Sequence, residues 1–127
     1  MTEDTPADIL RTRLRGDLRA AMKAQRQDEM AALRSLIAAI DNAESVEDAP
    51  SSSQPFSEHV AGALQGLGAA DAARRSLSEH DLQRIIEAEL WERDAQAERL
   101  TLLGRIDEAS RLRIEADVIA RYQIAAD

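Results

Sequence analysis

The apolar residues of this chain recur every three or four positions, and this spacing restricts the chain to a helical fold. Such spacing places apolar side chains along one face of an α-helix, the face that packs into a core. The clearest example begins near Asp28 and comprises Met30, Leu33, Leu36, Ile37 and Ile40. No segment alternates polar and apolar residues with period two, and the β-branched residues are scattered. We therefore expect an all-α fold.

The N-terminal part of the chain predicts two helices. Thr5 is a suitable N-cap and Pro6 a suitable first residue for a helix over about residues 6–24. The second helix starts near Asp28, after a polar break at residues 25–27. Because so short a break joins neighbouring helices, we expect these two to form an antiparallel hairpin.

The C-terminal part predicts two more helices. The third runs over about residues 79–103, with Ser76 or Ser78 as its N-cap and Gly104 as its stop. The fourth runs from residue 106 or 107 to about residue 123. These two form a second predicted hairpin.

Each predicted helix has one face for the core. Outside the second helix, we place on these faces Leu10, Leu14, Leu18, Ala21, Met22, Leu82, Ile85, Ile86, Leu90, Ala97, Leu100, Leu103, Ala109, Leu112, Ala116 and Ile119. The fourth helix carries a second apolar line of Ile114, Val118 and Tyr122. Two-sided packing is therefore expected there.

The 127 residues fit a single domain. Residues 46–75 are rich first in Ser, Pro and acidic residues and then in Ala and Gly, which is typical of a linker or insertion. We expect a small bundle of two helical hairpins joined by this long, partly disordered linker.

The composition excludes several classes of protein. The absence of Cys excludes disulfides, thiolate zinc sites and a Cys nucleophile. The first eight residues are too acidic for a signal peptide, and no apolar run approaches the roughly 18 residues of a membrane span. A soluble cytoplasmic protein without a membrane partner is expected. The net charge of −8 argues against nucleic-acid binding by the surface as a whole.

The sequence offers no catalytic residue, cofactor site or metal site. His59 and His80 have no second His at a metal-binding spacing. The glycines of residues 62–68 lack the Gly-Lys-Ser/Thr ending of a phosphate loop and follow no strand. We therefore expect no catalysis by this chain alone.

A basic stripe is the first candidate binding site. Residues 9–26 hold six cations and one carboxylate. On a helical projection, one face gathers Arg15, Arg19, Lys23 and Arg26. These side chains could follow the phosphates of a nucleic acid. The alternative is a solvated face that pairs with the acidic remainder of the chain.

A second candidate is an apolar contact surface. Trp91 and Leu102 lie about 20° apart on the third helix and point away from its core stripe. Because one core cannot bury both faces, these residues either contact the linker or form an interface with a partner.

Glu89 and Arg93 are spaced as neighbours along the same helix. This spacing predicts a structural ion pair, and such a pair fixes the register of packed helices.

The order of several segments resembles the GatB/YqeY-like family, which is related to the C-terminal part of the B subunit of tRNA-dependent amidotransferase. The matching positions are residues 18–24, 32–44 and 77–79, then Glu89, Arg93, Gly104, Arg105 and Ala109, and finally residues 115–122. The chain departs from the family pattern at Gln123 and Ile124, where Leu-Pro is typical, and at Trp91 and Leu102, where polar residues are usual.

The resemblance implies an all-helical region that is usually followed by a small helical tail domain. The sequence ends at Asp127, so the tail, the part associated with tRNA, is expected to be absent. Amidotransferase activity belongs to a separate catalytic region and is not expected here.

Two functions remain as hypotheses. The first is a non-catalytic helical module that associates with tRNA, or with amidotransferase subunits, through the basic stripe. The second is a protein-interaction or self-associating module without RNA contact, in which Trp91 and Leu102 are buried against the partner or a second copy.

Overall fold

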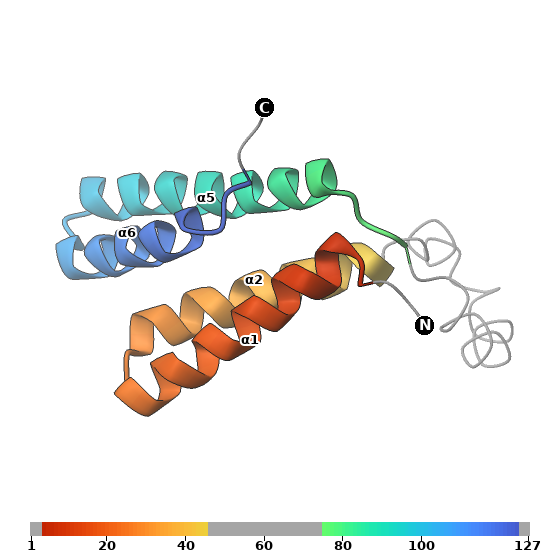
Figure 1. Ribbon diagram of the computed structural model, residues 1–127. Coiled ribbons are helices and arrows are strands. Elements are labelled where there is room, and N and C mark those ends of the chain that lie inside the picture. Colours follow the sequence, from red (N-terminus) through yellow and green to blue (C-terminus); the bar gives the residue numbers. More distant parts are fainter. Residues whose placement is uncertain (1–3, 46–74, 125–127) are drawn as a thin grey trace, which may run out of the picture.

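The computed structural model describes residues 4–45 and 75–124, and these residues form four α-helices and no strand. In chain order the helices are α1 (Pro6–Ala24), α2 (Gln27–Ser45), α5 (Glu79–Leu102) and α6 (Ile106–Ala120) (Figure 1). The all-α class is therefore confirmed for this part of the chain. The predicted linker covers residues 46–75, of which all but Arg75 lie outside the described residues.

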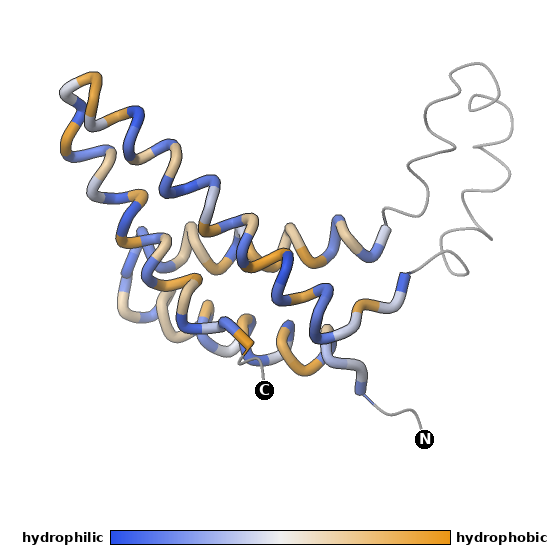
Figure 2. Tube along the Cα trace, turned by 90° about the horizontal axis from the view of Figure 1, so that it is seen from above, coloured by the Kyte–Doolittle hydropathy of each residue, from blue (hydrophilic) through white to orange (hydrophobic). Residues whose placement is uncertain are grey.

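The helices lie in two layers of two (Figure 1). α1 and α2 run side by side and are joined by Gln25 and Arg26, and residues 103–105 join α5 to α6. Seen from above, the α5–α6 layer crosses the α1–α2 layer obliquely (Figure 2). The joined ends of α5 and α6 therefore extend beyond the other pair.

Hydrogen-bonded caps begin α1 and α5. The Thr5 hydroxyl accepts from the Asp8 amide at 3.1 Å, and the Asp8 carboxylate accepts from the Thr5 amide. Ser78 and Asp81 form the same reciprocal pair at the start of α5. These capping boxes satisfy amides that have no partner inside the helix. Of the two predicted caps for α5, Ser78 is the one used.

A left-handed residue ends α1 and another follows α5. Gln25 has φ 57° and Gly104 has φ 80°. Each turn is closed by a backbone hydrogen bond from the next residue, Arg26 to the Ala21 carbonyl at 2.9 Å and Arg105 to the Leu100 carbonyl at 2.8 Å. This pattern is the Schellman motif, which reverses the chain within a few residues.

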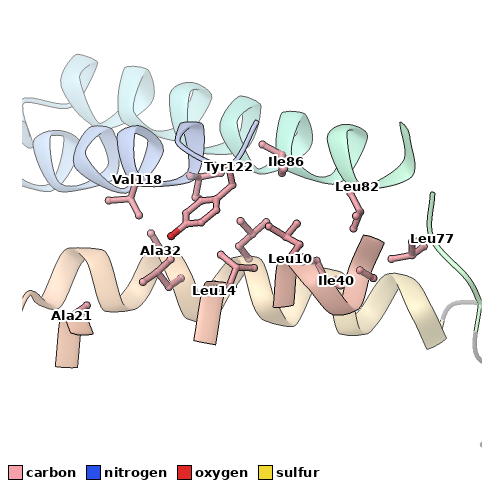
Figure 3. Close-up of a cluster of buried hydrophobic side chains, with 14 residues drawn as sticks. Leu10, Leu14, Ala21, Ala32, Ile40, Leu77, Leu82, Ile86, Val118 and Tyr122 are labelled. Atoms are coloured by element: carbon pink, nitrogen blue, oxygen red, sulfur yellow. The ribbon is translucent and has the colours of Figure 1, made fainter. Parts of the chain in front are cut away.

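The core lies between the layers and draws on all four helices, on Leu77 before α5 and on Tyr122 after α6 (Figure 3). Its largest fully buried side chains are Leu14, Leu33, Leu36, Ile40, Leu77, Leu82, Ile86 and Ile119. Most of the residues predicted for the core are buried or half-buried.

Two core predictions are wrong. Met22 is 48% exposed because Ala21, one position before it, takes the inward place in the last turn of α1. Leu103 is 66% exposed because it caps α5 and no longer follows the helical projection.

The end of the fourth helix also differs from the prediction. α6 stops at Ala120 rather than near Gln123, and the chain turns at residues 121 and 122. Val118 and Tyr122, predicted for a second apolar line, are buried in the core, whereas Ile114 of that line is exposed. The turn carries the Tyr122 ring between the layers (Figure 3).

A buried arginine links α1 to α2. Arg11 is 8% exposed and contacts Asp8 at 3.2 Å, Asp41 at 3.1 Å and Glu44 at 2.5 Å. Glu44 is also 8% exposed, so both charged groups of this pair are buried. Buried charges are tolerated only when they are paired in this way.

Candidate functional site

α1 is the only helix with a net positive charge among the four that the structure describes. It holds five cations and two carboxylates, whereas each of the other three has more carboxylates than cations. Arg15, Arg19 and Lys23 are spaced four residues apart, and all three are exposed. None of them forms an ion pair with another described residue. We call these three residues the basic face.

The carboxylates of α1 point elsewhere. Asp8 is held in the N-terminal capping box and by Arg11. Asp17 accepts a hydrogen bond of 2.5 Å from the Tyr122 hydroxyl. Asp17 is thus held by Tyr122, and the half-exposed Asp8 is held at the N-terminal end of α1, so neither carboxylate pairs with the basic face.

Arg26 does not continue the basic face. α1 ends at Ala24 and the chain then turns through Gln25, so the helical projection that placed Arg26 in the stripe does not apply. Its Nη1 atom lies 3.5 Å from Glu29 Oε1, and Arg121 Nη1 lies 3.4 Å from Glu29 Oε2. The predicted group of four cations is therefore three cations on α1 and one ion-paired arginine on the turn.

The basic face also has an apolar component. Arg19, Ala20, Met22 and Lys23 line a shallow hollow of about 640 Å³. The exposed Met22 side chain thus lies among cations. A ligand with both phosphates and flat apolar groups matches this mixture of contacts.

Tyr122 contacts two residues of α1, Arg13 and Asp17. The Arg13 guanidinium lies 4.6 Å from the centre of the Tyr122 ring, a cation–π contact. Burial, with a smaller contribution from the hydrogen bond to Asp17, raises the pKa of the Tyr122 hydroxyl well above its usual value. The hydroxyl therefore stays protonated at neutral pH and acts as a donor.

The pair of Glu89 and Arg93 belongs to a larger polar network. Arg93 Nη1 lies 2.9 Å from Glu89 Oε1, and Arg93 Nε lies 3.1 Å from Glu115 Oε1 on α6. The Ser35 hydroxyl of α2 donates to Glu89 Oε1 at 2.9 Å. The network ties α2, α5 and α6 together.

Ser35 and Glu115 were absent from the sequence prediction of this pair. Each is brought to Glu89 or Arg93 by packing between helices, so no local spacing signals the contact. The arrangement offers no nucleophile with a free base beside it, because Glu89 is occupied by both Ser35 and Arg93.

Trp91 and Leu102 are the exposed large apolar residues of α5, at 72% and 83%. The described residues leave both side chains open. The alternative that they contact residues 46–74 concerns a segment outside the described residues. Of the two histidines, His80 is exposed in the first turn of α5, and His59 lies outside the described residues.

Within residues 4–45 and 75–124, no three His, Asp or Glu side chains are grouped closely enough to hold a metal ion. None of the helices described there is long and apolar enough to cross a membrane.

No family model, curated protein or solved structure matches this chain.

Proposed function

We propose that this chain is a non-catalytic RNA-binding module whose basic face contacts the phosphates of a structured RNA. The observation that carries the proposal is the set of three exposed cations without ion-pair partners in the described part of the chain, on the one helix there with a net positive charge. Arginine and lysine spaced by one helical turn match phosphate recognition. Met22 adds a surface for base or ribose contact.

The acidic charge of the whole chain does not oppose this local contact strongly. Charges are screened over about 8 Å at physiological ionic strength, so a bound phosphate responds mainly to its nearest neighbours. Those neighbours on the basic face are Arg15, Arg19 and Lys23. The acidic helices lower the affinity for polyanions in general and favour ligands that fit this one face.

The resemblance to the GatB/YqeY-like family suggests tRNA as the RNA and a tRNA-dependent amidotransferase as the associated enzyme. We place the module in the cytoplasm on the same ground. In this proposal, the two helical hairpins joined by residues 46–74 act as one scaffold. The module supplies binding, and an associated enzyme supplies the transfer of ammonia.

Fluorescence anisotropy with labelled bulk tRNA at low salt tests the proposal. The triple variant Arg15→Ala, Arg19→Ala, Lys23→Ala should bind about tenfold or more weakly than the natural chain, because three charge-assisted contacts are removed. The matched control is Arg84→Ala, Arg111→Ala, Arg113→Ala, which removes the same charge from exposed positions on α5 and α6.

The control variant should retain most of the affinity of the natural chain. Equal weakening in the two variants would show that only net charge matters. Binding by the natural chain no tighter than that of an equally acidic control protein would remove the RNA proposal altogether.

A further inference from the structure

The outer surface of α5 carries a second stripe of small and apolar residues at alternating spacings of four and three. Its small and apolar members are Ala88, Trp91, Ala95 and Leu102. Glu98 occupies the position of the repeat between Ala95 and Leu102. Together they fall within an arc of about 80°, opposite the buried residues Leu82, Ile86 and Ala97. Alternation of four and three is the spacing at which one helix packs along another. We call this stripe the outer seam.

The shape of the outer seam suits a helix. Ala88 and Ala95 lie on either side of Trp91, so a large side chain stands between two small ones. A hollow of about 460 Å³ opens beside Trp91. Its lining is largely polar, with Ala95 and Leu112 beside Ser35, Glu89, Glu92, Arg93, Gln96 and Arg99. A partner helix could therefore insert a side chain there while its backbone approaches the alanines.

The charge around the outer seam is mainly negative. Glu92, Asp94 and Glu98 are exposed, and none of them forms an ion pair with another described residue. α5 as a whole has seven carboxylates and three cations, and one of those cations, Arg93, is already paired with Glu89 and Glu115. Two exposed cations, Arg84 and Arg99, also lie on or beside this arc, but the exposed carboxylates Glu87, Glu92, Asp94 and Glu98 outnumber them.

A second copy of α5 fits this surface poorly. In an antiparallel pair, Trp91 would pack against Ala95 of the second copy. Glu92 would then lie near Glu92 of the second copy, and Asp94 near Asp94 of the second copy. Parallel pairing would place Glu87 near the second copy's Glu92. The attraction of Asp94 to the second copy's Arg99 would offset that repulsion only in part, because Glu98 would also face Glu98 of the second copy. Like charges across a helix pair oppose association.

We propose that the outer seam docks a basic amphipathic helix of another protein. Small apolar residues of that helix pack against Ala88, Trp91 and Ala95, and its Lys and Arg side chains pair with Glu92, Asp94 and Glu98. A cation that reaches the exposed face of the Trp91 ring gains a cation–π contact as well. The seam spans about four helical turns, which sets the length of the partner helix at about 15 residues. This inference does not depend on RNA binding by α1.

Trp91 is the only tryptophan in the chain, so its fluorescence reports on the seam alone. The probe is a synthetic amphipathic peptide of Leu and Lys, and its matched control is the same peptide with every Lys replaced by Glu. The Lys peptide should shift the emission of Trp91 to shorter wavelength and protect it from acrylamide, and the Glu peptide should do neither.

Three variants separate docking on the seam from attraction by net charge. Ala95→Glu adds a negative charge but blocks the seam, so it should abolish the shift. Glu92→Gln with Asp94→Asn should weaken binding of the Lys peptide about tenfold. The control Asp107→Asn with Asp117→Asn, which removes the same charge from exposed positions on α6, should leave binding nearly unchanged.

Several results would overturn the proposal. These are an unchanged emission spectrum with the Lys peptide, equal shifts with the two peptides, or tighter binding by Ala95→Glu than by the natural chain. A shift that develops as the chain alone is concentrated would show that a second copy, not a basic helix, occupies the seam.

Discussion

The Tyr122 hydroxyl donates a hydrogen bond of 2.5 Å to Asp17 Oδ2, which joins the chain after α6 to the middle of α1. The Tyr122 ring is buried between the two helical layers, and Arg13 covers it at 4.6 Å. This contact fixes the helix that carries the basic face against the α5–α6 layer. It also holds the Asp17 carboxylate away from that face.

Replacing Tyr122 by Phe should therefore lower the free energy of unfolding by about 1.5–3 kcal/mol, the range for a hydrogen bond to a charged group. The ring and its packing remain, so the change isolates the hydroxyl. Urea unfolding followed by far-UV circular dichroism measures the difference. In a double-mutant cycle, Asp17→Ala should add little to Tyr122→Phe. If the two substitutions lowered the free energy of unfolding additively, the Tyr122 hydroxyl and the Asp17 carboxylate would not be coupled.

Arg11 is expected to matter more for stability than any cation of the basic face. Arg11→Met removes the partner of the buried Glu44 carboxylate, and breaking a buried pair in this way costs about 3–5 kcal/mol. Arg15→Met, on the exposed side of the same helix, should change the free energy of unfolding by less than about 0.5 kcal/mol. Thermal and urea unfolding of the two variants compare them directly. Similar values for both would contradict the burial of Arg11.

The N-terminal cap of α5 predicts a loss of stability in acid. Hydrogen bonds from the Ser78 amide and hydroxyl, assisted by Arg75, lower the pKa of Asp81 below its ordinary value of 3.8. A carboxyl whose pKa is lower in the folded state stabilises the fold above its unfolded pKa, and this contribution is lost as the pH falls through the folded pKa. The stability advantage of the natural chain over Asp81→Asn should be constant above about pH 5 and shrink below about pH 4. An advantage that grew in acid would refute this account of the cap.

The two left-handed residues predict substitutions of opposite sign. Gly104→Ala should destabilise the fold by about 1 kcal/mol, because a side chain disfavours φ 80° even though an added Cβ would meet no atom within 4 Å. Gln25→Gly should stabilise it by up to about 1 kcal/mol, because φ 57° suits glycine better. Melting temperatures of the two single variants give the signs. A stabilising Gly104→Ala would mean that the turn changes conformation.

Local sequence signals predicted much of this fold because local chemistry determines helix ends. Thr5, Ser78 and Gly104 mark ends that the structure shows. The end of α1 at Gln25 is harder to predict, since the glutamine side chain does not favour a left-handed conformation. The end of α6 depends on Tyr122 turning into the core toward Asp17, a contact over 105 positions of sequence that no periodicity reveals.

The candidate sites were predictable to different degrees. The cations of the basic face follow from a helical projection, but Arg26 was misplaced because the projection was carried past the end of α1. The exposure of Trp91 follows from the opposite core stripe. Ser35 and Glu115, which complete the network around Arg93, come from other helices and required the packed structure.

The salt dependence of tRNA binding tests the central claim, that the basic face contacts phosphates. Three such contacts contribute about 2–3 to the slope of log K against log salt concentration. The triple alanine variant of Arg15, Arg19 and Lys23 should therefore flatten that slope by about 2–3, while the control variant of Arg84, Arg111 and Arg113 keeps the slope of the natural chain. An unchanged slope in the first variant, or equal flattening in both, would contradict the claim.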